Sequence, residues 1–197
     1  MDSVIIFGGT FNPPHAGHVA MAEAALAEMP NARMLVIPTL IPPHKLPSDL
    51  AGAAERMEMC RLAFGHLPVM VSDIELNRAG PSYTSDTVRE LAAESDDTKL
   101  CFLCGMDMFA SLDRWHESDY LKSKLIFMVA GRPDSPDRDE AICAFNAAGG
   151  RAMPVKMPLC GISSTDIRNR ALPESSDDPL LPAAVAEYIA KHKLYQK

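Results

Sequence analysis

The chain has 197 residues, of which 47% are hydrophobic and 23% are charged, and its formal net charge is −7 at pH 7. This composition is ordinary for a folded protein and fits a single domain over residues 1–197. The negative charge disfavours a general nucleic-acid binder, which needs a basic face, and no apolar run reaches the ~20 residues of a membrane-spanning helix. We therefore expect neither nucleic acid nor a membrane as a partner. Because no basic segment precedes the first apolar run, we expect a cytoplasmic protein without a signal peptide.

The first predicted element is a short apolar strand, Val4–Phe7, which leads through Gly8–Pro14 into a helix that begins near His15. A run bounded in this way is typical of a buried parallel strand. The glycines let a ligand approach the main chain, and the free N–H groups of the following helix form an anion site. His15 and His18 lie three residues apart, so both rings should lie on one face of the first turn, beside that site. Each ring could alternatively be a cap or a solvated residue, and no third ligand nearby indicates a metal centre.

The pattern continues as an alternation of strands and helices. Strands are predicted at 33–38, 69–71, 100–104, 124–130 and 151–157, and helices at 19–29, 51–64, 87–94, 140–148 and 182–191. An acidic linker at 173–179 precedes the closing C-terminal helix. Strand–helix–strand units of this length have parallel strands and right-handed crossovers. The sequence therefore predicts an α/β fold: a Rossmann-like, doubly wound parallel sheet of about five or six strands with helices on both faces.

Polar residues follow several of these strands, at the sheet edge where open α/β sheets bind ligands. A Pro-rich loop carries His44 and Lys45, Gly105 and Asp107 follow the strand 100–104, and Arg132 follows the strand 124–130. Lysine and arginine at this edge could pair with a phosphate. The alternatives are an exposed connection for the Pro-rich loop and a helix N-cap for Asp107.

Two helix starts carry hydroxyl groups. Ser85 and Asp86 could cap the helix 87–94, and Ser163 with Asp166 forms a near capping box at a helix that contains Arg168. Hydroxyls and free N–H groups at the positive end of a helix suit an anion, although a plain capped helix is the alternative.

Cys101 and Cys104 form a C-x-x-C pair, and the chain has five cysteines. The pair lies in an apolar strand, whereas a reactive pair needs a helix N-terminus, so we interpret both as buried small side chains. A thiol redox protein built on this pair remains as an alternative of another class.

Three motifs carry a resemblance to a known family. Residues 8–18 closely resemble the G-G-T-F-[DN]-P-x-H-x-G-H signature of the nucleotidyltransferase superfamily, and residues 162–168 resemble its I-S-S-T-x-I-R motif. Residues 82–87 resemble the S-Y-T-x-[DQ]-T element of bacterial nicotinate mononucleotide adenylyltransferases. The resemblance spans essentially the whole chain. Asn12 departs mildly, because many members have Asp there; the amide loses one charge but keeps the ability to form the turn.

The resemblance implies transfer of AMP from ATP to nicotinate mononucleotide, giving nicotinate adenine dinucleotide and pyrophosphate in NAD biosynthesis. It implies four residues that act on phosphates in catalysis: His15, His18, Lys45 and Arg168. It implies ATP contacts from Gly8, Gly9, Thr10, Phe11, His15, His18, Gly105, Asp107, Ile162, Ser163, Ser164 and Arg168. It implies nicotinate mononucleotide contacts from Asn12, Lys45, Tyr83, Thr84, Trp115, His116 and Arg132. Mg²⁺ is expected to travel with ATP, without a metal site on the protein.

In such enzymes a tryptophan stacks on the pyridine ring while main-chain groups near the Tyr-Thr pair and after the tryptophan hold its carboxylate. The resemblance assigns these roles to Trp115, Tyr83–Thr84 and His116, although a lone tryptophan is often a core residue.

Other readings stay open. Phosphopantetheine adenylyltransferase shares the first motif but is typically shorter and lacks the Ser-Tyr-Thr and Trp elements. A relative that prefers nicotinamide mononucleotide would keep the same chemistry, and a nucleotide-sensing binding protein would keep the fold without turnover. The sequence leaves the oligomeric state open, a homo-oligomer included.

Overall fold

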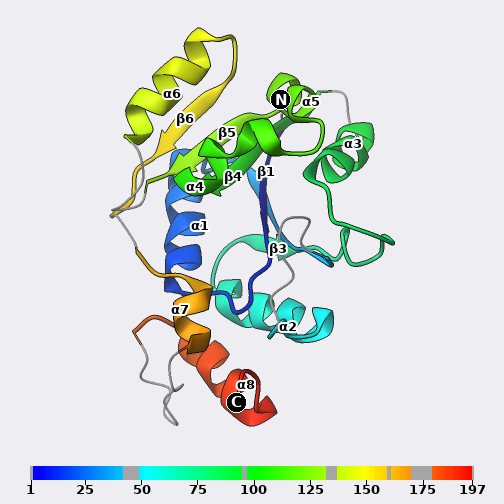
Figure 1. The fold of residues 1–197 in the computed structure, drawn as a ribbon, viewed down its shortest axis with the longest axis vertical. Coiled ribbons are helices and arrows are strands. Elements are labelled where there is room, and N and C mark those ends of the chain that lie inside the picture. Colours follow the sequence, from blue (N-terminus) through cyan, green and yellow to red (C-terminus); the bar gives the residue numbers. More distant parts are fainter. Residues whose placement is uncertain are drawn as a thin grey trace.

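The computed structural model describes residues 2–41, 49–94, 97–131, 137–158, 161–169 and 179–196. Its centre is a sheet of six strands in the order β3-β2-β1-β4-β5-β6, and every neighbouring pair is parallel. The strands are β1 (Ser3–Gly9), β2 (Arg33–Pro38), β3 (Val69–Val71), β4 (Lys99–Gly105), β5 (Ile126–Ala130) and β6 (Ala152–Val155). The predicted doubly wound parallel sheet is confirmed (Figure 1).

Helices connect these strands. They are α1 (Ala16–Glu28), α2 (Ala53–Phe64), α3 (Thr84–Glu94), α4 (Met106–Ala110), the 3₁₀ turn η1 (Leu112–Arg114), α5 (Ser118–Lys124), α6 (Arg138–Ala147), α7 (Ser164–Asn169) and α8 (Ala183–His192). Figure 1 shows α6 and β6 at one end of an elongated molecule and α8 at the other.

Alternating side chains of the central strands enter two separate cores. In β1, Ile5 and Phe7 pack into a core with residues of α1, α2, α7 and α8, whereas Val4 and Ile6 pack into a core with residues of α3, α4, α5 and α6. Both faces are therefore buried, which explains why the strands are continuous apolar runs rather than alternating ones. None of the helices in the described part of the chain is long and apolar enough to cross a membrane.

The start of α3 differs from the prediction. The helix begins at Thr84, three residues earlier than expected, so Ser85 lies inside it with no exposed surface and does not cap it. The N–H groups of Asp86 and Thr87 both donate to the carbonyl of Tyr83, which closes the first turn there. The capping roles predicted for Ser85 and Asp86 are therefore wrong.

The sheet changes winding direction between its two central strands. From β1 the chain continues to β2 on one side, while β4 pairs with β1 on the other side. The carboxyl ends of β1 and β4, Gly9 and Gly105, thus flank a crevice at the switch point, which is where open α/β sheets bind ligands. The short helices α4, η1 and α5 follow β4 directly and were not predicted from the sequence.

Candidate functional site

A cavity of about 460 Å³ lies at this switch point, a volume ordinary for a small-molecule site. Its lining includes the ends of β1 and β4, the first turns of α1 and α3, and the start of α7. Twelve of the residues predicted for the site line it: Gly8, Gly9, Thr10, His15, His18, Thr84, Gly105, Asp107, Trp115, Ile162, Ser163 and Ser164.

The two histidines lie against each other in the cavity wall. Their ring centroids are 3.7 Å apart with an angle of 32° between the planes. The backbone N–H of His15 donates to Nδ1 of His18 at 3.2 Å. Because Nδ1 of His18 accepts a hydrogen bond, a neutral His18 ring carries its proton on Nε2, which makes that atom a donor. The prediction that both rings share the first turn beside the loop is confirmed.

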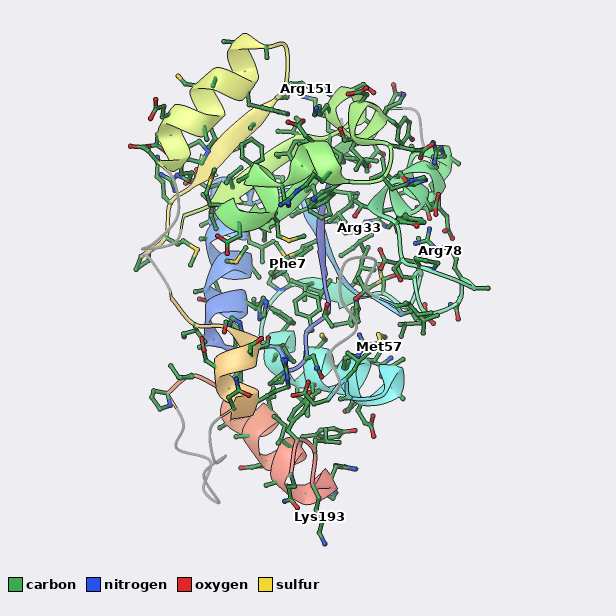
Figure 2. The ribbon with its side chains drawn as sticks, in the orientation of Figure 1. Phe7, Arg33, Met57, Arg78, Arg151 and Lys193 are labelled. Atoms are coloured by element: carbon green, nitrogen blue, oxygen red, sulfur yellow. The ribbon has the colours of Figure 1, made fainter. Side chains whose placement is uncertain are left out.

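Phe11 packs in the core beneath the loop that follows β1 and is not part of the cavity lining. Its ring is 2% exposed and packs edge-on against Phe7 and Phe64, at centroid distances of 5.3 and 5.9 Å. A Cβ atom at Gly9 would lie 3.1 Å from the Phe11 ring, so a side chain there would displace this support. Figure 2 labels Phe7 in the interior of the molecule.

Asn12 and Arg168 hold the loop to later parts of the chain and do not appear in the cavity lining. Asn12 Oδ1 accepts hydrogen bonds from the N–H of Ala51 at 3.0 Å and from the hydroxyl of Tyr195 at 2.7 Å. Arg168 donates to the carbonyl of Asn12 and to the carboxylate of Asp49, at 2.7 Å in both cases. Burial raises the pKa of Tyr195 above its usual range, so its hydroxyl stays a donor.

The start of helix α7 forms part of the cavity wall. The hydroxyl of Ser163 accepts the N–H of Asp166 at 3.1 Å, which confirms the predicted cap. The hydroxyl of Ser164 donates to the carbonyl of Pro13 at 2.8 Å. Helix α7 is thereby attached to the loop that precedes His15, across a separation of 151 residues.

Aromatic residues form another part of the site. The Trp115 ring packs edge-on against Phe102, with centroids 5.5 Å apart, and its Nε1 donates to Ser111 at 3.2 Å. Only 8% of Trp115 is exposed, yet it lines the cavity, so it serves the core and the site together. The rings of Tyr83 and His116 lie 4.3 Å apart; neither is part of the lining, although Thr84, which follows Tyr83, is.

Glu75 was missed by sequence reasoning and lines the cavity near Thr84. It is 5% exposed, and the hydroxyl of Thr87 donates to its Oε1 at 2.9 Å. Burial raises the pKa of Glu75 to about 7, against the opposing effects of the Thr87 hydrogen bond and the charge of Arg78. The only sequence signal was its place between two apolar residues, Ile74 and Leu76.

Arg56 was also missed as a support of the site. It lies in α2, and it is 1% exposed although it is a charged residue. Its guanidinium donates to the carbonyls of Thr10, Thr39, Leu40 and Ala51 at 2.6 to 3.3 Å. Burial lowers its pKa. The Arg56 guanidinium thus joins the loop after β1 to the loop after β2. This needs the several N–H donors of a planar guanidinium, which an ammonium group lacks.

The C-x-x-C cysteines are confirmed as buried residues of a strand. Cys101 packs into one core and Cys104 into the other, so their thiols lie on opposite faces of the sheet. Burial raises the pKa of both thiols, that of Cys104 to about 12. This arrangement removes the basis for a redox pair.

Three residues of interest lie outside the described residues: His44, Lys45 and Arg132. Within the ranges that the structure describes, no three His, Cys, Asp or Glu side chains gather closely enough to hold a metal ion.

Comparisons with known proteins agree with this geometry. Residues 6–170 match the family described as cytidylyltransferase-like. The chain is 36% identical to a probable nicotinate-nucleotide adenylyltransferase of Thermomicrobium roseum, over 100% of this chain and 92% of the relative. It is 37% identical to one of Listeria monocytogenes, over 98% and 96% of the two chains.

Among solved structures, the fold resembles the nicotinic acid mononucleotide adenylyltransferase of Plasmodium falciparum complexed with NaAD. The TM-score is 0.81 at 16% identity, over 99% of this chain and 98% of that one. A putative nicotinate-nucleotide adenylyltransferase from Vibrio parahaemolyticus gives a TM-score of 0.69 at 19% identity, over 100% and 97% of the chains. At these identities the likeness supports the fold alone.

Proposed function

Because the chain belongs to the cytidylyltransferase-like family and, within it, to the nicotinate-nucleotide adenylyltransferases, we propose that it transfers AMP from ATP to nicotinate mononucleotide. The products are nicotinate adenine dinucleotide and pyrophosphate, and the reaction is a step of NAD biosynthesis. Its substrates are two small anionic nucleotides. We keep the predictions of a cytoplasmic enzyme that binds neither nucleic acid nor a membrane.

One observation carries the proposal: a single cavity holds two sets of groups with different chemistry. Glycine backbone, the His15–His18 pair and the hydroxyls of Ser163 and Ser164 form a set suited to phosphates. Thr84 and Trp115 form a set suited to a flat aromatic ring. A reaction that transfers AMP from a triphosphate to a pyridine nucleotide needs both sets in one cavity.

The chemistry requires alignment more than proton transfer. An oxygen of the 5′-phosphate of nicotinate mononucleotide attacks the α-phosphorus of ATP, and the bond from that phosphorus to the oxygen bridging to the β-phosphate breaks. The electron pair leaves with pyrophosphate. The attacking phosphate is already ionised near neutral pH, so no general base is needed. Catalysis then rests on positioning two polyanions and on stabilising charge at the α-phosphate and the leaving group.

We assign the His15–His18 pair to stabilising the charge at the α-phosphate and the leaving group. Nε2–H of His18 is the donor defined by the hydrogen bond that its Nδ1 accepts, and we assign it to the α-phosphate region. His15, stacked on it at 3.7 Å, is assigned to the neighbouring phosphate oxygens. Donors held rigidly in this way cost no reorganisation when the charge develops.

Arg168 and Lys45 are assigned to the β- and γ-phosphates. Arg168 is held by Asp49 through Nε and by the carbonyl of Asn12 through Nη1, so a phosphate would compete with the carboxylate of Asp49 for this guanidinium. Lys45 follows from the sequence motif alone. We assign Arg132, on the same grounds, to the phosphate of the mononucleotide.

The pyridine end is assigned to Trp115 and the start of α3. Trp115 would stack on the ring, and main-chain donors near Thr84 and His116 would hold the carboxylate. The contact between the Tyr83 and His116 rings supports this assignment, because it fixes the two main-chain segments next to each other.

Mg²⁺ is expected as a companion of ATP. Asp107 and Glu75 are the carboxylates that line the cavity within the described part of the chain. Such a sparse donor set suits an ion that keeps most of its ligands from phosphate and water. When bound, Mg²⁺ supplies neutralisation of the triphosphate charge.

The testing experiment is a comparison of kcat/KM, with ATP and Mg²⁺, for nicotinate mononucleotide, nicotinamide mononucleotide and phosphopantetheine. We expect the first to exceed the second by about a hundredfold or more, because a site of fixed donors discriminates strongly between a carboxylate and a neutral amide. Turnover of phosphopantetheine alone would contradict the proposal. Absence of pyrophosphate release with every substrate would favour a binding protein.

A further inference from the structure

The loop that joins β1 to α1 has a backbone conformation that its own sequence does not favour. Phe11 has a φ of 47°, in the left-handed region, which is unfavourable for a residue with a Cβ atom. Such a conformation persists where the surrounding contacts fix it. His15 ends this loop and lines the cavity, so contacts that fix the loop also fix a group assigned to phosphate.

The side chain of Asn12 is fixed at both ends of its amide. Oδ1 accepts from the N–H of Ala51 at 3.0 Å, and Nδ2 donates to the carbonyl of Asp49 at 3.2 Å. An N–H can only donate and a carbonyl can only accept, so these two partners determine which way the amide lies. The hydroxyl of Tyr195, 2.7 Å from Oδ1, must then donate to it. Asn12 is 2% exposed, so water has little access to replace this hydroxyl.

Tyr195 follows a helix end that has a defined structure. Lys193 is the C-cap of α8 with a φ of 53°, and the N–H of Leu194 donates to the carbonyl of Ile189 at 3.1 Å, as in a Schellman motif. Tyr195 also has a positive φ, of 61°. Burial raises the pKa of its hydroxyl against the opposing charge of Arg168, so the proton that it donates stays in place.

Residues 180–195, which we call the closing segment, are attached to the loop at two points. The carbonyl of Leu180 accepts the N–H of Ala16 at 2.8 Å, and Tyr195 donates to Asn12. Helix α8 lies between these two attachments, and its apolar face packs into the core. Figure 1 shows α7 and α8 beyond the loop that joins β1 to α1. One packed helix thus holds both ends of this stretch of the loop.

Asn12 extends this support to the phosphate end of the cavity. Its carbonyl accepts from Nη1 of Arg168 at 2.7 Å, and His15 follows three residues later, between the two attachments. Both Arg168 and His15 are assigned above to the phosphates of ATP. A displacement of the peptide at Asn12 would therefore move both groups at once.

We propose that Tyr195 is a positioning residue of the adenylyl transfer, which acts through Asn12 on Arg168 and His15. Tyr195 does not appear in the cavity lining, so it contributes without touching a substrate. The inference rests on the proposed function, because it assumes that Arg168 and His15 act on ATP. A reaction that depends on aligned donors is sensitive to small shifts, and a misplacement of about 1 Å can cost about a hundredfold in rate.

The first test compares two substitutions of tyrosine by phenylalanine. Tyr195→Phe removes the hydroxyl and keeps the ring, which packs against the core. We expect kcat to fall about tenfold and Kd for ATP with Mg²⁺ to rise about threefold, because one of the two donors to Asn12 is lost. Tyr188→Phe makes the same change within α8, where the ring stacks on His192 with centroids 4.2 Å apart. This control should keep both values within about twofold. An unchanged kcat in Tyr195→Phe would overturn the inference.

Titration calorimetry with ATP and Mg²⁺ separates positioning from a loss of folded protein. It reports the binding stoichiometry, which measures the folded fraction, together with the affinity. For a positioning role, Tyr195→Phe should bind ATP with the stoichiometry of the unaltered protein and with reduced affinity. A stoichiometry that falls in proportion to kcat, at an unchanged affinity, would show that the hydroxyl only stabilises the fold and would refute the positioning role.

A double-mutant cycle tests the route through Asn12. Asn12→Ala removes the acceptor, so adding Tyr195→Phe to it should lower kcat by less than about twofold further. Independent effects that multiply would contradict the proposed route. If the unaltered protein failed to turn over nicotinate mononucleotide, the proposed function would fall. The ATP affinities of the unaltered protein and Tyr195→Phe would then still decide whether Tyr195 positions the ATP site.

Discussion

The carboxylate of Asp49 lies 2.7 Å from Nε of Arg168, 119 residues further along the chain. The side chain of Arg168 is 9% exposed and that of Asp49 is 39% exposed, so water reaches the ion pair mainly at the carboxylate. Arg168 is assigned to the phosphates of ATP, and in the structure Asp49 occupies its Nε. The carboxylate therefore competes with the phosphate for the same cation.

Replacement of Asp49 by asparagine should relieve this competition. The carbonyl of Asn12 still holds Nη1 of Arg168, so the guanidinium should stay in place. We expect KM for ATP to fall about twofold to fivefold at low salt, because an ion pair with one partly exposed member is worth up to ~1 kcal/mol, and the difference should shrink at high salt. A rise in KM would mean that Asp49 orients Arg168 for the phosphate instead.

His18→Ala should lower kcat by about a hundredfold to a thousandfold, because it removes a preorganised donor to the developing charge. KM for ATP should change far less. Steady-state kinetics give both values. His66→Ala is the control, since His66 is exposed and pairs only loosely with Glu23, at 3.4 Å. An unchanged kcat in His18→Ala would remove this residue from the mechanism.

Two variants should separate the contribution of Trp115 to stability from its contribution to binding of the mononucleotide. Trp115→Ala should reduce the free energy of unfolding by about 3–5 kcal/mol, because the ring is almost completely buried against Phe102. Trp115→Phe should retain much of that stability while raising KM for nicotinate mononucleotide about tenfold through the smaller ring face. Denaturant titration and kinetics separate the two effects. A normal KM in both variants would place the tryptophan outside the pyridine site.

Arg56→Lys should destabilise the protein although it preserves the charge. An ammonium group cannot reach the four carbonyls that the guanidinium contacts, so buried acceptors lose their partners, at a cost of about 3 kcal/mol. Arg61→Lys on the same helix should change stability by less than ~0.5 kcal/mol, because Arg61 is 57% exposed at the side chain. Urea unfolding of the two variants is the test, and equal midpoints would contradict this role for Arg56.

Glu75→Gln should alter the pH dependence of stability. The raised pKa means that the folded protein binds more protons than the unfolded chain between about pH 4.5 and pH 7. The contribution of Glu75 to stability is therefore present below pH 4.5 and is lost as pH rises through 7, by an amount on the order of 3 kcal/mol. Glu75→Gln should be the more stable protein at pH 8, with the difference vanishing near pH 4. A constant difference in the free energy of unfolding would contradict this.

The strands and the loop motifs could be predicted because their signals are local. Strand β2 was predicted with the bounds that the structure has, and twelve predicted residues line the cavity. Each strand is an apolar run, and each motif follows a strand at the edge where parallel sheets bind ligands. The start of α3 could not be predicted, because burial of Ser85 inside the fold overrides its usual preference for a cap.

The supporting residues escaped prediction for a different reason. Arg56 has the spacing of a surface residue, and only the tertiary fold brings four carbonyls around it. The hydrogen bond between Asn12 and Tyr195, 183 residues away, was not predicted either. Contacts across such distances leave no periodic signal in the chain.

Those distances have a consequence for the order of folding. The hydrogen bonds that attach α7 and the C-terminal residues to the first loop join positions 151, 156 and 183 residues apart. Closing such long loops is entropically costly, so these contacts form after the sheet that they rest on. During refolding, the far-ultraviolet circular dichroism should therefore recover before the ability to bind nucleotide does. A molecule could have a complete sheet and still lack a working pocket.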